Sequence, residues 1–155
     1  MSSIRNGKAR AVADTAQGHL VASVELAAPP ERVFRALASK EVTDWWVRAG
    51  VFDTREWSGD VCIGGRWRAS GVARGHPYAV EGEFLEIDPP RKLVHTWQLV
   101  GTSNAPTTVT YDLVRLGDGT RVTLRHAGFT SAETCTNTAI GWETSFEQLA
   151  ESLAP

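Results

Sequence analysis

The sequence has few cysteines and no long apolar run. Its two cysteines, Cys62 and Cys135, fit no Cys-x-x-Cys pattern and are too few for a disulfide scaffold. No apolar run approaches the roughly 18–20 residues that span a bilayer, and the N-terminus lacks the uninterrupted apolar core of a secretory signal. We therefore expect a reduced, cytoplasmic protein that has no membrane partner.

A strong charge of either sign is also absent. The formal net charge of −2 predicts no attraction to nucleic acid or to an anionic membrane. None of the histidines has the i, i+4 spacing or the nearby Cys/Asp pair of a metal site; they are His19, His76, His95 and His126. Since no catalytic motif is complete either, we expect no metal and no cofactor.

The length of 155 residues indicates one domain. Residues 1–18 show no sustained period, so we expect a flexible lead, with one extra edge strand as the alternative, and a single domain over residues 19–155. Residues 19–27 alternate apolar and polar side chains, which is typical of a half-buried strand.

Two short helices and then a run of strands are expected next. Pro29-Pro30 ends the first strand and suits the first turn of a helix, and Ser39 can cap a second short helix that contains Trp45 and Trp46. From there to residue 127 the chain has strand patterns without intervening helices, which predicts an antiparallel meander. The predicted strands are residues 53–58, 66–71, 78–87, 93–100, 107–116 and 120–126.

The chain ends in a predicted amphipathic helix. Thr130 and Glu133 match a capping box, and the apolar stripe that follows has the spacing i, i+4, i+7, i+11. Its members are Trp142, Phe146, Leu149 and Leu153. Gly141 costs about 1 kcal/mol relative to alanine inside a helix, so it indicates either close approach of another element or space beside Trp142.

This order resembles the helix-grip fold of the START-like, pollen-allergen-like (SRPBCC) superfamily. The similarity rests on four stretches: Pro29–Phe34, Gly64–Trp67, the proline-turned hairpin Gly82–Trp97, and Gly141-Trp142. Within the superfamily the chain is most similar to the C-terminal domain of the activator of the heat-shock chaperone ATPase. The implied fold class is α+β, with a curved antiparallel sheet of about six to seven strands wrapped on a long C-terminal helix.

The resemblance implies a cavity between the sheet and the C-terminal helix, with Trp45 or Trp46 at its mouth. The residues expected to bind a ligand there are Trp46, Trp67, Trp97, Tyr111, His126, Trp142 and Phe146. An indole combines flat apolar area with one donor, which suits a pocket. Core packing is the competing interpretation for each tryptophan. For His126 the competing interpretation is a buried, hydrogen-bonded histidine. The functional interpretation is a ligand-facing donor or a general base.

The sequence patterns and the family resemblance lead to three hypotheses about function. The first is a non-catalytic module that binds a small apolar or aromatic molecule. The second is a co-chaperone or regulator in the stress response that binds a chaperone or another protein, although residues 1–18 are too short for the separate N-terminal domain of such activators. The third is an aromatase/cyclase-like enzyme with His126 or Tyr111 as acid or base. Either a monomer or a homodimer, formed through a sheet edge or an aromatic patch, is expected.

Overall fold

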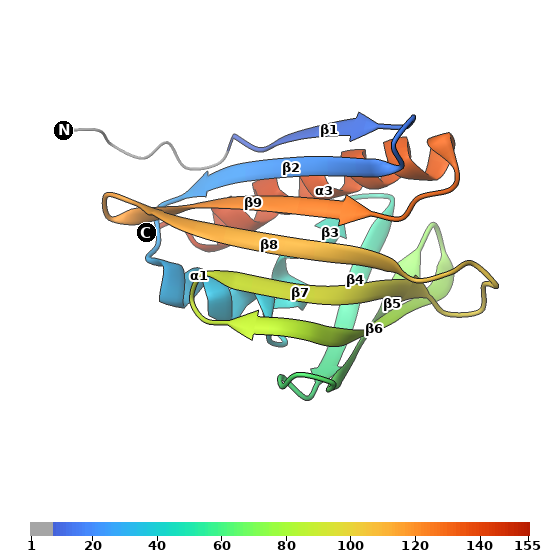
Figure 1. The fold of residues 1–155 in the computed structure, drawn as a ribbon, viewed down its shortest axis with the longest axis horizontal. Helices are drawn as coiled ribbons and strands as arrows, with labels where there is room; N and C mark the ends of the chain where they lie inside the picture. The colour runs from blue at the N-terminus through green and yellow to red at the C-terminus, as the bar shows by residue number, and fades with distance from the viewer. Residues whose placement is uncertain (1–7) are drawn as a thin grey trace.

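The computed structural model describes residues 8–155. They form one antiparallel sheet in the order β1-β2-β9-β8-β7-β6-β5-β4-β3, curved over a long helix (Figure 1). The strands are β1 (Arg10–Asp14), β2 (His19–Leu26), β3 (Val47–Arg48), β4 (Phe52–Gly59), β5 (Arg66–Ala73), β6 (His76–Asp88), β7 (Lys92–Leu99), β8 (Thr107–Leu116) and β9 (Gly119–Ala127). The expected meander is therefore confirmed from β4 to β9.

The described residues contain nine strands, where the sequence pattern predicted six to seven. The additional strands are β1 and β3, and β3 is only two residues long, too short to show a period. The prediction of a flexible lead is wrong for Arg10–Asp14, because these residues pair with β2. They form the extra edge strand that was the alternative prediction. The N–H of Ala11 also donates to Glu143 Oε2 at 2.9 Å. The first seven residues of the predicted lead lie outside the described part of the chain.

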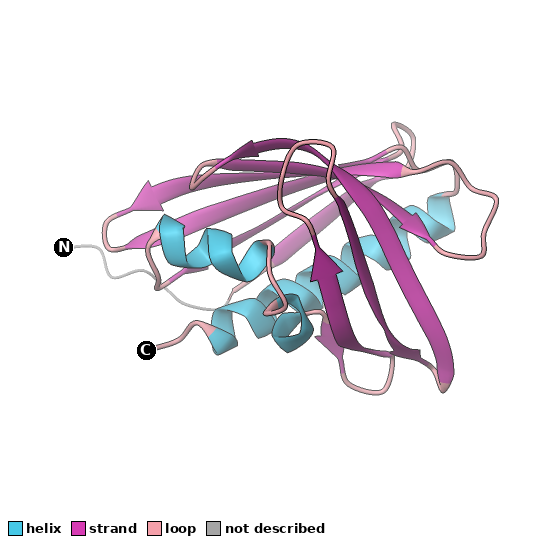
Figure 2. Cartoon of the chain, turned by 90° about the horizontal axis from the view of Figure 1, so that it is seen from below, coloured by secondary structure: helices cyan, strands magenta, loops and turns pink. Residues whose placement is uncertain are grey.

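The helices of residues 8–155 cover the concave face of the sheet (Figure 2). They are α1 (Pro30–Leu37), α2 (Val42–Trp45) and α3 (Ala132–Ser152), so the α+β helix-grip class is confirmed. The cap of α3 differs from the capping box, because Ser131 Oγ, and not Thr130, accepts a hydrogen bond from the N–H of Thr134 at 3.2 Å. Within residues 8–155 no helix is long and apolar enough to cross a membrane.

The C-terminal half of α3 packs against α2 and the sheet. Phe146 and Leu149 of α3 are fully buried, as is Trp45 of α2. The Trp45 ring lies 6.1 Å from that of Phe146, and its Nε1–H donates to the carbonyl of Ala36 at 2.9 Å. Trp45 is thus a satisfied core residue, and its placement at the mouth of a cavity is excluded.

Candidate ligand-binding site

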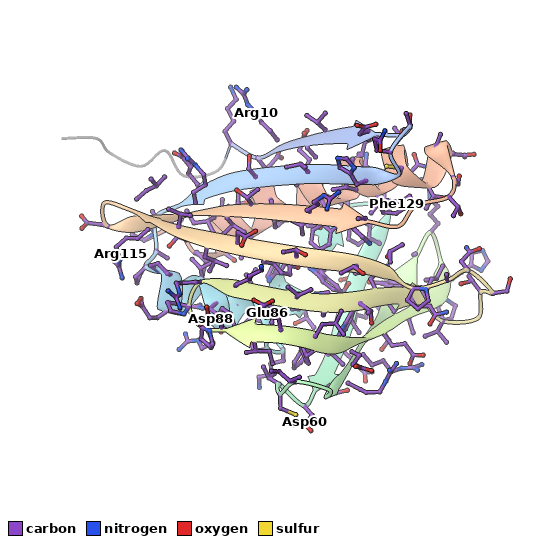
Figure 3. All side chains as sticks on the ribbon, in the orientation of Figure 1. Arg10, Asp60, Glu86, Asp88, Arg115 and Phe129 are labelled. Carbon is purple, nitrogen blue, oxygen red and sulfur yellow. The ribbon has the colours of Figure 1, made fainter. Side chains whose placement is uncertain are left out.

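A pocket of about 650 Å³ lies between the N-terminal half of α3 and the sheet. On the side of the sheet it is lined by residues of β4, β5, β6 and β7, the start of β8 and the end of β9. Exposed residues of the β7–β8 loop, such as Asn104, and of the first turns of α3, such as Asn137, form its mouth. Phe129, labelled in Figure 3 at the end of β9 where α3 begins, is half-buried beside it.

The wall contributed by α3 is made of small side chains. Thr134, Thr138, Gly141 and Ser145 line the pocket, and their spacing of four, three and four residues places them on one helix face. A Cβ at Gly141 would approach only Phe52 Cε1, at 3.9 Å. Of the two explanations for this glycine, the structure therefore supports space beside Trp142.

Three tryptophans line the inner part of the pocket, and we call them the tryptophan floor: Trp46, Trp97 and Trp142. Trp46 follows α2, Trp97 lies on β7 and Trp142 on α3. Their ring centroids are separated by 4.9 Å (Trp46–Trp97), 5.7 Å (Trp97–Trp142) and 5.9 Å (Trp46–Trp142). These are the tilted and edge-on contacts that aromatic rings favour.

The residues expected to bind a ligand divide into two layers. Trp46, Trp97, His126 and Trp142 line the pocket. The other three pack in the core and do not line it: Trp67, Tyr111 and Phe146. The alternation of a strand tells which face a side chain is on, but the curvature of the sheet decides how deep it lies.

His126 is held in one protonation state by its neighbours. The indole Nε1–H of Trp142 donates to His126 Nδ1 at 3.0 Å, so Nδ1 is an acceptor and the proton is on Nε2. That Nε2–H donates to Thr107 Oγ1 at 2.6 Å, and the hydroxyl of Thr107 donates to the carbonyl of Trp97 at 3.1 Å. Every polar atom of the ring is therefore satisfied.

Burial, with a smaller contribution from nearby His95, lowers the pKa of His126 to about 3. The imidazole is neutral at pH 7, and its only lone pair is occupied by the indole of Trp142. The interpretation of His126 as a buried, hydrogen-bonded histidine agrees with these contacts. An acid or base role, as the enzyme alternative requires, would need these hydrogen bonds to break.

His95 was missed as a candidate from the sequence. It is buried on the inner face of β7, with its ring 4.9 Å from Trp67 and 5.8 Å from Tyr111. Its Nδ1–H donates to the carbonyl of Thr96 at 2.9 Å, and burial lowers its pKa to about 4. The alternation Leu93, His95, Trp97 was the signal that could have placed it on the inner face.

Several buried donors have no hydrogen-bond partner within residues 8–155. Three of them belong to aromatic side chains: Trp46 Nε1, Trp67 Nε1 and the hydroxyl of Tyr111. Burial raises the pKa of Tyr111 well above its usual value, so the hydroxyl keeps its proton. An unpartnered buried donor costs about 1–3 kcal/mol. Of the three residues, only Trp46 lines the pocket, where a bound molecule could supply an acceptor.

The described residues offer no group of three or more His, Cys, Asp or Glu side chains that could hold a metal ion. Cys62 is exposed and Cys135 is buried, and both are free thiols. What the pocket presents is therefore indole and phenyl faces with hydroxyl and amide groups around them. Such a surface can bind and orient a molecule through apolar contact and hydrogen bonds.

A curved antiparallel sheet that holds a long C-terminal helix, with a pocket between them, defines the START-like helix-grip class. This fold is a ligand-binding scaffold. Residues 27–154 match the family described as "Activator of Hsp90 ATPase homolog 1-like protein". The chain belongs to this family, as the resemblance of its motifs indicated.

Solved structures of bacterial proteins share the fold. Protein CV1439 from Chromobacterium violaceum is 26% identical over 89% of this chain and 98% of its own, with a TM-score of 0.81. Protein Ms6760 from Mycobacterium smegmatis is 19% identical over 99% and 96%, with a TM-score of 0.78. CalU16 from Micromonospora echinospora is 21% identical over 99% and 88%, with a TM-score of 0.65. No curated protein matches the chain.

Proposed function

We propose that this protein binds a small apolar or aromatic molecule on the tryptophan floor. The observation that carries the proposal is the floor itself: three indoles from three separate parts of the chain line one pocket of about 650 Å³. Pockets for drug-sized ligands have volumes of roughly 300–1,000 Å³ and are lined mostly by apolar and aromatic side chains. The space beside Gly141 gives a flat ring room to enter.

Apolar burial would drive this binding. A ligand that loses about 200 Å² of apolar surface gains ~5 kcal/mol, before the costs of association are subtracted. Hydrogen bonds at the walls would set the orientation of the ligand and contribute less to affinity. The proposal therefore predicts that affinity rises with the apolar area of the ligand.

Tryptophan fluorescence and thermal melting against a panel of apolar, aromatic and acyl compounds test this function. Binding to the native state gives a saturable spectral change and a rise in Tm that depends on ligand concentration. The variant Trp97→Ala should abolish or strongly weaken both effects. Trp57→Ala is its matched control, since Trp57 is also half-buried but does not line the pocket. A flat response of the wild-type protein across the panel rejects the proposal.

Regulation of a chaperone ATPase is the second candidate, and the family description favours it. Such a function would use the surface and would not need the pocket. Titration of the purified protein into Hsp90, with the rate of ATP hydrolysis as the readout, tests it directly. An unchanged rate at saturating protein removes this candidate and leaves the ligand-binding proposal untouched.

A further inference from the structure

The walls of the pocket carry no formal charge. The chain has 16 Lys and Arg and 18 Asp and Glu residues, yet none of those within residues 8–155 lines the pocket. None of the charged side chains labelled in Figure 3 lines the pocket; they are Arg10, Asp60, Glu86, Asp88 and Arg115. Two titratable rings line the wall, and both are hydrogen-bonded. The nitrogens of His126 are both engaged, and the hydroxyl of Tyr78, whose pKa burial raises, bonds to the hydroxyl of Thr54.

This lack of charge makes the pocket discriminate between neutral ligands and ions. An ion that entered the pocket would lose hydration without meeting a counter-charge, and an unpaired buried charge is far more costly than a neutral polar group. A neutral molecule loses much less hydration and gains the same contact with the tryptophan floor. The walls therefore favour uncharged ligands over ions of the same shape.

Ser145 supplies a free hydroxyl in the same pocket. Its side chain lines the pocket and its residue is only 4% exposed. Two threonines of α3 bond the carbonyl four residues earlier, Thr138 to Thr134 at 2.7 Å and Thr144 to Ile140 at 3.1 Å. Ser145 makes no such bond within the described chain, although its helix position would allow it. Its hydroxyl is therefore available to a molecule in the pocket.

The tryptophan floor holds a second free donor, the Nε1–H of Trp46, which is buried without a partner. From the uncharged walls and these two donors we infer that the pocket is selective for uncharged aromatic molecules that carry an oxygen acceptor, and that Ser145 donates to this oxygen. The inference rests on the proposed function and names its ligand class. A hydroxyl, ketone or ether oxygen is such an uncharged acceptor, whereas a carboxylate carries a charge that no wall residue balances.

Four pyrene compounds of nearly equal size test the selectivity: pyrenemethanol, methylpyrene, pyrenecarboxylate and pyrenemethylamine. Energy transfer from tryptophan to pyrene at pH 7.5 reports binding to the full-length protein. We expect the two uncharged probes to bind on the order of 100-fold more tightly than the anion and the cation. If either ion binds within about 10-fold of pyrenemethanol, the inference fails while the proposed function stands. If none of the four binds, the inference fails, and a flat response to the apolar, aromatic and acyl panel as well rejects the proposed function.

The variant Ser145→Ala tests the hydrogen bond. Loss of one neutral hydrogen bond should weaken pyrenemethanol binding by about 3- to 10-fold and leave methylpyrene binding unchanged. Ser152→Ala, on the same helix but outside the pocket, should change neither. Equal effects of Ser145→Ala on the two uncharged probes, or no effect on either, overturn the role of Ser145.

A change of wall charge gives an independent check. Thr138→Lys places an ammonium group in the wall and should raise the affinity for pyrenecarboxylate by about 10-fold relative to pyrenemethylamine. Thermal melting of each variant establishes that it is folded before binding is measured. An unchanged ratio of the two affinities in folded Thr138→Lys protein contradicts the claim that wall charge sets the selectivity.

Discussion

The two halves of α3 face the same curved sheet but leave very different interiors. Its C-terminal half presents large apolar side chains, Phe146 and Leu149, which are fully buried against their neighbours. Its N-terminal half presents Thr134, Thr138 and Gly141, and a pocket of about 650 Å³ lies in front of them. We refer to these regions as the packed end and the hollow end.

The comparison shows that side-chain volume along one helix decides where this fold is filled. Both ends have regular helix geometry and strands with an apolar inner face, so the backbone does not distinguish them. Protein interiors pack densely when large side chains are available to fill them. Where the helix instead places glycine and small hydroxyl residues opposite the sheet, a cavity remains. Trp142 lies between the two ends, because its ring lines the pocket and also packs against Trp45 and Phe146.

The largest expected effect is at the packed end. Trp45→Ala should lower the free energy of unfolding by about 3–5 kcal/mol, because it opens a cavity and leaves the carbonyl of Ala36 without the indole N–H. At the hollow end, Phe52→Ala should cost less than half as much, since Phe52 is half-buried beside existing space. Urea denaturation of both variants measures the difference. Equal losses would mean that the two ends are packed alike.

A fall in pH affects both the core and the pocket, because His95 is buried beside Trp67 and Tyr111 in the core and His126 lies in the pocket wall. Their folded-state pKa values are lowered from 6.5 to about 4 and about 3. Below pH 6.5 the unfolded chain therefore binds protons that the folded chain does not. The stability is complete above pH 6.5 and is lost as the pH falls toward 4, by about 2 kcal/mol for each histidine at pH 5.

Urea denaturation at pH 7.5 and pH 5 measures this loss, which is about 4 kcal/mol for the two histidines together. The substitution His95→Gln removes one titrating group and should reduce the loss by about half. If the wild-type protein is equally stable at both pH values, the two imidazoles are not buried in the folded state as the structure has them.

The elements of the fold were predictable from the sequence where their period is long enough to recognise. The strands from β4 to β9 and the stripe of α3 have clear periods of two and of 3.6 residues. β3 has two residues and shows no period at all. β1 alternates over only five residues and gains stability from its pairing with β2, which a local pattern does not reveal.

The candidate site was predictable only in part, since a pattern gives the face of a side chain and not its depth. Trp97 and Tyr111 both lie on the inner face, but only Trp97 reaches the pocket. Ser145 carries no sequence signal of its own, because a serine in a helix is ordinary. Its significance comes from Gly141 one turn earlier and from the gap opposite, which depend on how the sheet curves around the helix.

A smaller effect concerns the start of the hollow end. Ser131 caps α3, so Ser131→Ala should lower the free energy of unfolding by about 1 kcal/mol, whereas Thr130→Ala should leave it nearly unchanged. Both residues line the pocket, but only Ser131 caps the helix. The difference in stability between the two variants therefore measures the contribution of the cap. Thermal or urea denaturation decides between them, and a larger loss for Thr130→Ala would restore the capping box expected from the sequence.

The smallest effect is the most direct measure of the space at the hollow end. Gly141→Ala should raise the free energy of unfolding by roughly 0.5–1 kcal/mol, because alanine is the better helix former and its Cβ meets only Phe52 Cε1 at 3.9 Å. Gly82→Ala is the control within the packed sheet, where a Cβ would collide with the carbonyl oxygen of Thr96 and destabilise the protein. Stability changes of opposite sign in Gly141→Ala and Gly82→Ala would show that Gly141 faces open space and Gly82 faces closely packed backbone. A loss of stability in Gly141→Ala would show that the pocket beside Trp142 is already filled.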